Sequence, residues 1–163
     1  MDESAAAIRE GLAAATEYLD VRFVGYLQDA QKEYAEARLT YAVVREEPLP
    51  RPGELEVVED APYLNGMAEA VGEGRRHILD LLRAGEVDRA ERTLATLEDL
   101  YGLLATMDYP DAITLNLRRS TDIARSLIEK TRGDLFIAFA QHSMHEALER
   151  HAHDVLGGGS SSA

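Results

Sequence analysis

The chain has 163 residues and a formal net charge of −13, from 30 acidic and 17 basic side chains. This length predicts a single domain with a buried core. The chain lacks cysteine, which excludes disulfides and thiolate metal sites and is typical of a reducing compartment. No apolar run approaches the roughly 18 residues of a membrane-spanning helix, and the acidic first residues are unlike a signal peptide. We therefore expect a cytoplasmic protein without membrane contact.

The acidic excess also bears on the environment and the partners of the protein. Only Lys32 and Lys130 are lysines, and the other basic residues are arginines. This balance is typical of cytosolic proteins from high-salt organisms, although an ordinary acidic surface gives the same composition. A strongly acidic protein repels nucleic acid in dilute buffer. Molar salt, in which the Debye length is about 3 Å, largely screens that repulsion.

Apolar residues recur at helical spacing through most of the chain, and the alternation typical of strands is hard to find. Three prolines and a glycine predict a loop over 47–61. We expect helices over 3–18, 20–45, 62–84, 86–107 and 111–156, the last with a break near Gly133. The predicted fold is all-α, an antiparallel bundle of five to six helices. It forms one domain over 1–156, and the Gly/Ser-rich residues 157–163 read as a flexible tail.

Two pairs of glutamates stand out on neighbouring predicted helices. Glu33 and Glu36 are three residues apart and Glu69 and Glu73 are four apart, so each pair shares one helix face. If the helices pack together, four carboxylates converge, and such like charges need a proton or a cation between them. A hard divalent cation such as Mg²⁺ fits that need. The alternative is that these glutamates only solvate two helix faces, which spacing alone favours in so acidic a chain.

The helix of the second pair carries three glycines at 66, 72 and 74, each costing about 1 kcal/mol against alanine. Such glycines are tolerated where another backbone or a ligand comes close.

Basic residues gather in 118–132, where five of them accompany only two acids. Together with two arginines that follow the second glutamate pair, they are the candidates for phosphate contact. The alternative is that they bridge acids on neighbouring helices or subunits. The candidate nucleic-acid-binding residues are Arg75, Arg76, Arg118, Arg119, Arg125 and Lys130.

A histidine-rich segment near the C-terminus is a weaker candidate. His142, His145, Glu146 and Glu149 could share a face and bind a transition metal. The segment matches no zinc-protease motif and lies beside an end of the chain. The sequence has no phosphate-binding loop, dinucleotide fingerprint or nucleophile elbow. It also lacks the Glu-x-x-His motif of ferritin-like di-iron bundles.

Several motifs between Phe23 and Leu135 are similar, in order and spacing, to those of the translin family. They are Gln31-Lys-Glu-Tyr-Ala-Glu-Ala37, Tyr63-Leu-x-Gly-x-Ala-Glu-x-x-Gly-Glu73, Gly85-Glu-Val-Asp88, Asp108-Tyr-Pro110, Leu117-Arg-Arg-x-x-Asp122 and Lys130-x-Arg-Gly133. Together they cover about two thirds of the sequence. The chain resembles the translin-associated factor X branch more than translin itself, because translin has apolar residues where this chain has Glu33 and Glu36.

The resemblance implies an all-α fold, oligomers that often contain eight subunits, and binding of single-stranded RNA or DNA. For the factor X branch it also implies a Mg²⁺-dependent endoribonuclease, with Mn²⁺ as the alternative ion. By that resemblance Glu33, Glu36 and Glu69 are metal ligands, and Glu73 is a further ligand or a base. The family usually has Asp where this chain has Glu69, and its members begin with a longer helical segment.

Two other functions stay open at this point. One is a non-catalytic protein that binds single-stranded nucleic acid. The other is an oligomer-forming scaffold, a partner for itself or for a related translin-family subunit.

Overall fold

The computed structural model describes residues 2–15 and 25–157, and in these ranges every regular element is helical. The elements are α1 (Asp2–Ala15), α3 (Gly25–Arg45), the 3₁₀ helix η1 (Pro52–Glu54), α4 (Asp60–Arg83), α5 (Val87–Ala105), α6 (Asp111–Thr114) and α7 (Leu117–Gly157). The all-α prediction is therefore confirmed. The expected end of the first helix, at residues 16–18, and the expected start of the second, near residue 20, lie outside the described residues, as do residues 158–163 of the expected tail.

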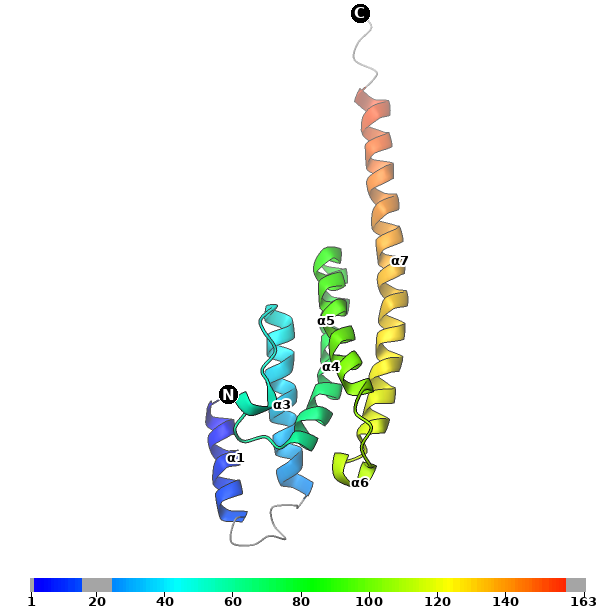
Figure 1. Cartoon of the computed structure of the whole chain (residues 1–163). Helices are drawn as coiled ribbons and strands as arrows, with labels where there is room; N and C mark the ends of the chain where they lie inside the picture. Colours follow the sequence, from blue (N-terminus) through cyan, green and yellow to red (C-terminus); the bar gives the residue numbers. More distant parts are fainter. Residues whose placement is uncertain (1, 16–24, 158–163) are drawn as a thin grey trace, which may run out of the picture.

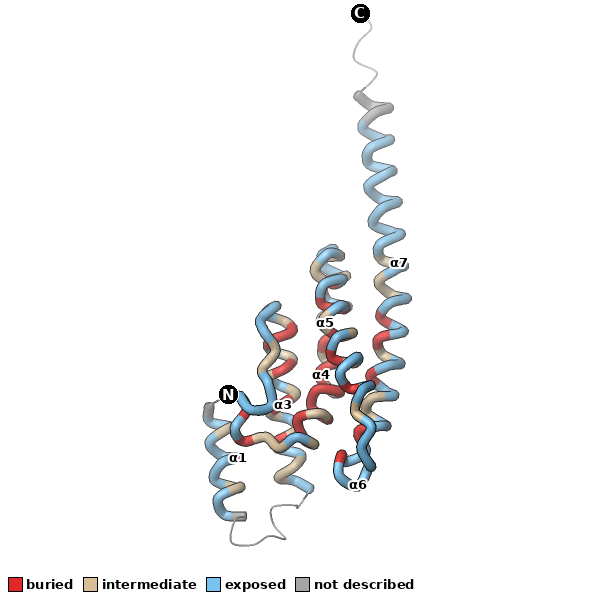
Figure 2. The backbone as a smooth tube through the Cα atoms, viewed as in Figure 1, coloured by how far each residue is buried: buried red, intermediate tan, exposed pale blue. Residues whose placement is uncertain are grey.

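Helix α4 lies at the centre of the bundle. It packs against α3 on one side and against α5 and α7 on the others, while α1 packs against α3. Figure 1 shows α3, α4, α5 and α7 side by side, with α7 extending far beyond the ends of its neighbours. The core lies where the four helices meet, and its large residues are almost completely buried, among them Leu39, Met67, Ile78, Leu97 and Leu104. Figure 2 shows these buried positions concentrated on the facing sides of the helices.

Gly66 allows α3 and α4 to approach closely. A Cβ atom at this position would lie 2.6 Å from the carbonyl oxygen of Lys32 and 2.9 Å from the amide nitrogen of Glu36. Real Cβ atoms do not come this close to backbone, so only glycine fits here. The expected close approach of another backbone is thus confirmed at Gly66, and it occurs directly beside the first glutamate pair.

The corner before α7 is held by a buried amide. The side-chain nitrogen of Asn65 donates to the carbonyl oxygen of Thr114 over 2.8 Å, and its side-chain oxygen accepts from the Ser120 hydroxyl over 3.0 Å. Between these contacts Leu115 and Asn116 adopt left-handed backbone conformations, with φ of 55° and 62°. Such residues are unfavourable, and the hydrogen bonds of Asn65 offset part of that cost. Asn65 therefore fixes where α7 starts relative to α4.

Helix α7 continues through Gly133, so the break predicted there is wrong. The residues around Gly133 explain this result, because Ile128 and Thr131 are buried against the bundle and Leu135 packs at its edge. That packing outweighs the roughly 1 kcal/mol that one glycine costs a helix. From residue 139 to residue 153 the described side chains are all exposed (Figure 2). None of the described helices is long and apolar enough to cross a membrane.

Candidate metal centre and nucleic-acid interface

The closest group of acids joins α3 and α4. Glu33, Glu36 and Glu69 each place one carboxylate oxygen within 4.8 Å of the other two. We call these three residues the glutamate cluster. Glu33 and Glu36 share a face of α3, and Gly66 lies one turn before Glu69 on α4. The close contact of the two backbones at Gly66 therefore brings the three carboxylates together.

Burial and mutual repulsion strongly perturb Glu36. Burial raises the pKa of this carboxyl, and the charges of Glu69 and Glu33 raise it further, to about 7. A proton therefore remains on the cluster up to neutral pH. A pKa shift of this kind marks a place where negative charge is concentrated and poorly solvated. A bound cation would relieve the same repulsion.

Lys32 already supplies one positive charge to the cluster. Its ammonium nitrogen lies 3.0 Å from a Glu69 carboxylate oxygen and 3.6 Å from one of Glu33. Burial lowers the pKa of Lys32, but the hydrogen bond and charge of Glu69 outweigh this effect, so the net shift is upward. Sequence reasoning missed Lys32. The available signal was its position on α3, one helical turn before Glu36, in a chain with only two lysines.

Glu73 lies beside the cluster and outside it. Its carboxylate pairs with the Arg76 guanidinium one turn later, at 2.9 Å. Of the four predicted glutamates, the structure therefore brings together three, and it places Glu73 at the rim.

The glutamate cluster borders a groove of about 290 Å³ between α4 and α7. Glu36, Glu69 and Glu73 line one side, together with Ala68 and Gly72. The other side is formed by three residues of α7, which we call the α7 wall: Ser120, Ile123 and Leu127. Ile123 is 53% exposed, a large fraction for an aliphatic side chain. The groove thus has an anionic side and a largely apolar side.

The predicted phosphate-binding residues do not form one surface. Arg75 points into the bundle, where it donates to the Thr131 hydroxyl over 2.8 Å and pairs with Asp134 over 2.8 Å. Its side chain is only 20% exposed. These contacts join α4 to α7. For Arg75 they agree with the alternative interpretation, in which the arginines bridge acids on neighbouring helices.

Arg118 and Arg125 lie on the edge of α7 that faces α5. Arg118 approaches Asp108, in the connection that follows α5, at 3.6 Å. Arg125 pairs with Glu129 at 3.1 Å, and the hydrogen bond and charge of Glu129 raise the pKa of its guanidinium. Arg132, on the same edge, pairs with Glu98 of α5 at 2.6 Å.

Arg119 and Lys130 lie on the opposite edge of α7, the edge of Ile123. At about 100° per residue, they are rotated only about 40° and 20° from Ile123 around the helix axis. Both are exposed, and neither forms an ion pair with any residue in the described ranges. Arg76, also exposed, stands on α4 at the rim of the same groove. Three of the six predicted basic residues are thus exposed on the side of the groove, although none of them lines it.

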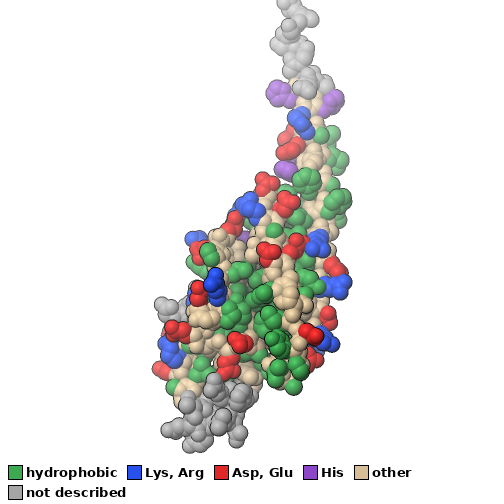
Figure 3. All heavy atoms as spheres, in the orientation of Figure 1, with side chains coloured by type: hydrophobic (Ala, Val, Ile, Leu, Met, Phe, Trp, Pro, Cys, Tyr) green, Lys and Arg blue, Asp and Glu red, His purple; other side chains and the backbone are tan. Residues whose placement is uncertain are grey.

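The histidine-rich segment belongs to the projecting part of α7. His142 and His145 each lie near the glutamate one turn later, with nitrogen–oxygen distances of 3.3 Å to Glu146 and 3.2 Å to Glu149. Figure 3 shows histidine side chains on the narrow extension, alongside hydrophobic side chains. Within the described residues, the only group of three or more candidate ligands is the glutamate cluster.

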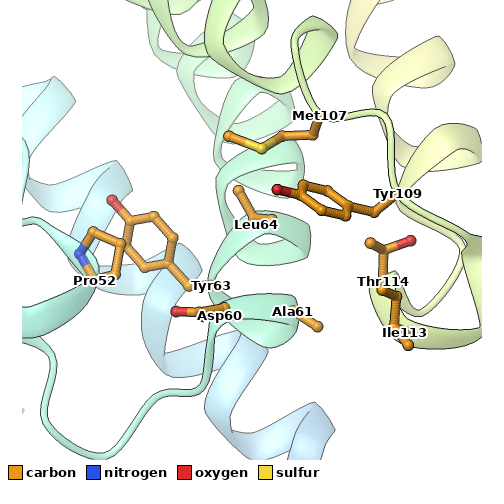
Figure 4. A pocket seen from close by; sticks show the side chains of 9 residues that line it. All are labelled: Pro52, Asp60, Ala61, Tyr63, Leu64, Met107, Tyr109, Ile113 and Thr114. Carbon is orange, nitrogen blue, oxygen red and sulfur yellow. The ribbon is translucent and has the colours of Figure 1, made fainter.

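A larger, mainly apolar cavity of about 510 Å³ opens elsewhere, between the start of α4 and the α5–α6 connection. Figure 4 shows Met107 and Tyr109 across from Leu64 of α4, with Asp60 at the edge. Asp60 is the only charged residue of its lining, so this cavity offers no constellation for acid–base or metal chemistry.

The fold and the groove define an all-α protein with a carboxylate cluster at a helix–helix contact. No protein-family profile matches the chain. It is 35% identical over 128 residues to the uncharacterized protein MJ0175 of Methanocaldococcus jannaschii, and the match covers 78% of this chain and 57% of that protein. The chain thus spans little more than half the length of this relative.

Two solved structures are similar over 86% of the chain. A structure of AfC3PO in complex with duplex RNA matches with a TM-score of 0.75 and 35% identity, covering 73% of that chain. A crystal structure of AfC3PO matches with a TM-score of 0.73 and 34% identity, covering 74%. AfC3PO is a translin-family complex. The present chain therefore belongs to the translin family, as its motifs indicated, and its place in the factor X branch stays a prediction.

Proposed function

We propose that the protein is a divalent-metal-dependent endoribonuclease whose metal site is the glutamate cluster. One observation carries the proposal: three carboxylates from two helices meet within 4.8 Å, and Glu36 holds a proton up to about pH 7. A carboxyl whose pKa is strongly raised by burial and by neighbouring charges is a candidate for a functional site.

The donor set of the cluster suits Mg²⁺ or Mn²⁺. All candidate ligand atoms are carboxylate oxygens, which hard cations prefer, and no nitrogen or sulfur ligand joins them. A cation bound there would lower the pKa of a coordinated water, which supplies a nucleophile for a phosphodiester. Glu33, Glu36 and Glu69 would be the ligands. Glu73, next to them and held by Arg76, is in reach to accept a proton at the rim of the groove.

RNA is the proposed substrate. This assignment is supported by the similarity to AfC3PO, which was solved with duplex RNA, and by the exposed cations around the groove. Arg76, Arg119 and Lys130 would hold phosphates on the side of the cluster. We keep single-stranded RNA or DNA as the expected ligand, as the family resemblance implies.

An oligomer is part of the proposal. AfC3PO is a complex, and the outer part of α7 exposes Phe136, Ile137, Phe139, Met144 and Leu148. Apolar surface of this extent on a projecting helix favours contact with another subunit. Eight subunits stay the number expected from the family resemblance.

A second candidate is a non-catalytic nucleic-acid-binding protein. It is favoured by the ion pairs of Lys32 with Glu69 and of Arg76 with Glu73, which compensate part of the acidic charge without a metal. In that case the cluster serves only to join α3 to α4.

Cleavage of end-labelled single-stranded RNA distinguishes the two candidates. The protein is tested in high salt with Mg²⁺ or with EDTA, as wild type, Glu36→Gln and Glu91→Gln. Glu91 is an exposed residue of α5, away from the cluster, so Glu91→Gln makes the same change of charge as a control. We expect Mg²⁺-dependent cleavage by the wild type and the control, and a loss of at least about 100-fold with Glu36→Gln. RNA that is bound but stays intact in all samples would establish the non-catalytic candidate instead.

A further inference from the structure

The α7 wall faces the glutamate cluster across the groove and has no role in the chemistry described so far. Ile123 is 53% exposed, and Leu127 lies one turn along the helix. The Ser120 hydroxyl is engaged by Asn65, so the wall presents mainly hydrocarbon to the groove. The groove therefore sets an exposed aliphatic surface opposite the carboxylates of Glu36, Glu69 and Glu73.

We propose that the α7 wall is the subsite for one unpaired nucleoside of the RNA strand, and that Ile123 is its main contact. The inference rests on the proposed function in one respect: this nucleoside carries the phosphate that approaches the glutamate cluster.

The size of the groove favours a single nucleoside. Its volume of about 290 Å³ lies at the small end of sites for small organic ligands. A base that stays paired within a duplex cannot enter so narrow a space, whereas an unstacked base can. Apolar side chains also contact unstacked bases in other nucleic-acid-binding proteins.

The charges along the same edge of α7 fit a strand that passes over Ile123. Arg119 lies four residues before it and Lys130 seven after, about 6 Å and 10 Å along the helix axis. Phosphates of a stacked strand rise about 3.4 Å each. The two cations are therefore placed for phosphates a few nucleotides to either side of the bound nucleoside. The other edge of α7 carries Arg118 and Arg125, which lie near acidic residues.

The two edges of α7 provide a matched comparison. Binding of labelled single-stranded RNA and of blunt duplex RNA is measured by fluorescence anisotropy in EDTA over a series of KCl concentrations. The proteins are the wild type, Ile123→Ala, the double variant Arg119→Gln/Lys130→Gln, and the double variant Arg118→Gln/Arg125→Gln, which removes the same charge from the other edge.

We expect Ile123→Ala to weaken binding of the single strand about five- to tenfold and to leave duplex binding within twofold, in line with the loss of one base contact. The Arg119→Gln/Lys130→Gln variant is expected to reduce the slope of log affinity against log salt by about 1.4, since each single-strand phosphate contributes about 0.7. The control variant Arg118→Gln/Arg125→Gln is expected to change this slope by less than half as much.

Three results would overturn the inference. The first is that Ile123→Ala weakens binding of single-stranded and duplex RNA equally. The second is that the two double variants change the slope of log affinity against log salt equally. The third is that the wild type does not bind single-stranded RNA. Light scattering adds a fourth: if Ile123→Ala dissociates the oligomer, Ile123 belongs to a contact between copies of the chain. Because EDTA removes metal from every sample, these comparisons measure binding alone and decide the subsite, whereas the nuclease is decided by the separate cleavage assay in Mg²⁺.

Discussion

Glu36 links the proposed metal binding to pH, because its carboxyl is a candidate metal ligand and has a strongly raised pKa. Its carboxyl has an ordinary pKa near 4.5 in an unfolded chain and about 7 in the folded protein. A raised carboxyl pKa means that the folded state binds the extra proton more tightly. The resulting stabilisation is present below pH 4.5 and is lost as the pH rises from 4.5 to 7. Above pH 7 the metal-free cluster carries a repulsion that Lys32 offsets only in part.

The first prediction follows from this shift. In EDTA, wild type and Glu36→Gln should have similar thermal stability near pH 5, and Glu36→Gln should be the more stable of the two at pH 8. The reason is that the neutral amide never acquires the charge that burial and Glu69 disfavour. Thermal unfolding at both pH values, with Glu91→Gln as the control, measures the difference. A difference between wild type and Glu36→Gln that does not change with pH would contradict the account.

The positive charge of Lys32 partly neutralises the glutamate cluster when no metal is bound. The contact of Lys32 with Glu69, at 3.0 Å, occupies one of the two carboxylate oxygens that Glu69 could offer a metal. A cation entering the cluster must therefore compete with the ammonium group or displace it.

Replacing Lys32 with methionine keeps most of the side-chain volume and removes the charge. We expect Lys32→Met to lower the stability of the metal-free protein by about 1 kcal/mol and to enlarge the stabilisation that Mg²⁺ gives. Thermal unfolding with and without Mg²⁺ tests both parts. Arg83→Met, which breaks an exposed pair with Asp80, should change stability by less than about 0.5 kcal/mol. If Mg²⁺ stabilises Lys32→Met no more than wild type, Lys32 does not compete for the site.

At the scale of the elements, the α3–α4 contact assembles the cluster. Gly66 places the backbone of α4 directly against the backbone of α3 at Lys32 and Glu36. A displacement of either helix there would also separate Glu69 from the other two glutamates.

Gly66→Ala should therefore destabilise the protein by about 1–3 kcal/mol, since its Cβ would meet backbone atoms that cannot turn away. Gly102→Ala is the matched control. Gly102 is an exposed position of α5 where a Cβ would meet nothing within 4 Å, so alanine should stabilise by about 0.5–1 kcal/mol. Urea denaturation measures both. A Gly66→Ala protein as stable as wild type would show that the two helices are not in this contact.

Helical periodicity was sufficient to predict the two glutamate faces and most of the elements. The single helix expected over 111–156 is instead divided into α6 and α7 by the left-handed residues Leu115 and Asn116. Apolar spacing placed the helices, and the spacing of Glu33 and Glu36 put both on one face of α3. The sequence could not show that Gly133 would stay helical, because the packing of Ile128 and Thr131 decides that. Local propensity alone favoured a break.

The basic residues of α7 show more clearly what the sequence alone could not predict. In the sequence, Arg118 and Arg119 are neighbours and look equivalent. In the fold they lie on different edges of α7, one near α5 and one on the side of the groove. Which edge faces which helix depends on contacts such as Asn65 with Ser120, and these join residues far apart in the chain. The inward turn of Arg75 likewise depends on Asp134, 59 residues later.

For the whole molecule, the bundle has two regions of different character. The inner part, from α3 to the first half of α7, buries the core and positions the groove. The outer part of α7 projects from it with exposed apolar residues (Figure 3). This division separates the proposed metal site from the surface expected to contact other subunits. A change on the projecting helix should therefore affect assembly before it affects the cluster.

The central claim is that Glu33, Glu36 and Glu69 together bind a divalent cation, and binding of Mn²⁺ followed by electron paramagnetic resonance tests it most directly. The measurement compares wild type, Glu36→Gln and Glu91→Gln at pH 8 in high salt, with Mg²⁺ as the competitor. The account predicts at least one Mn²⁺ per chain that Mg²⁺ displaces in wild type and Glu91→Gln, and loss of this site in Glu36→Gln. Equal Mn²⁺ binding by Glu36→Gln and wild type would contradict it, and the cluster would then be only a contact between two helices.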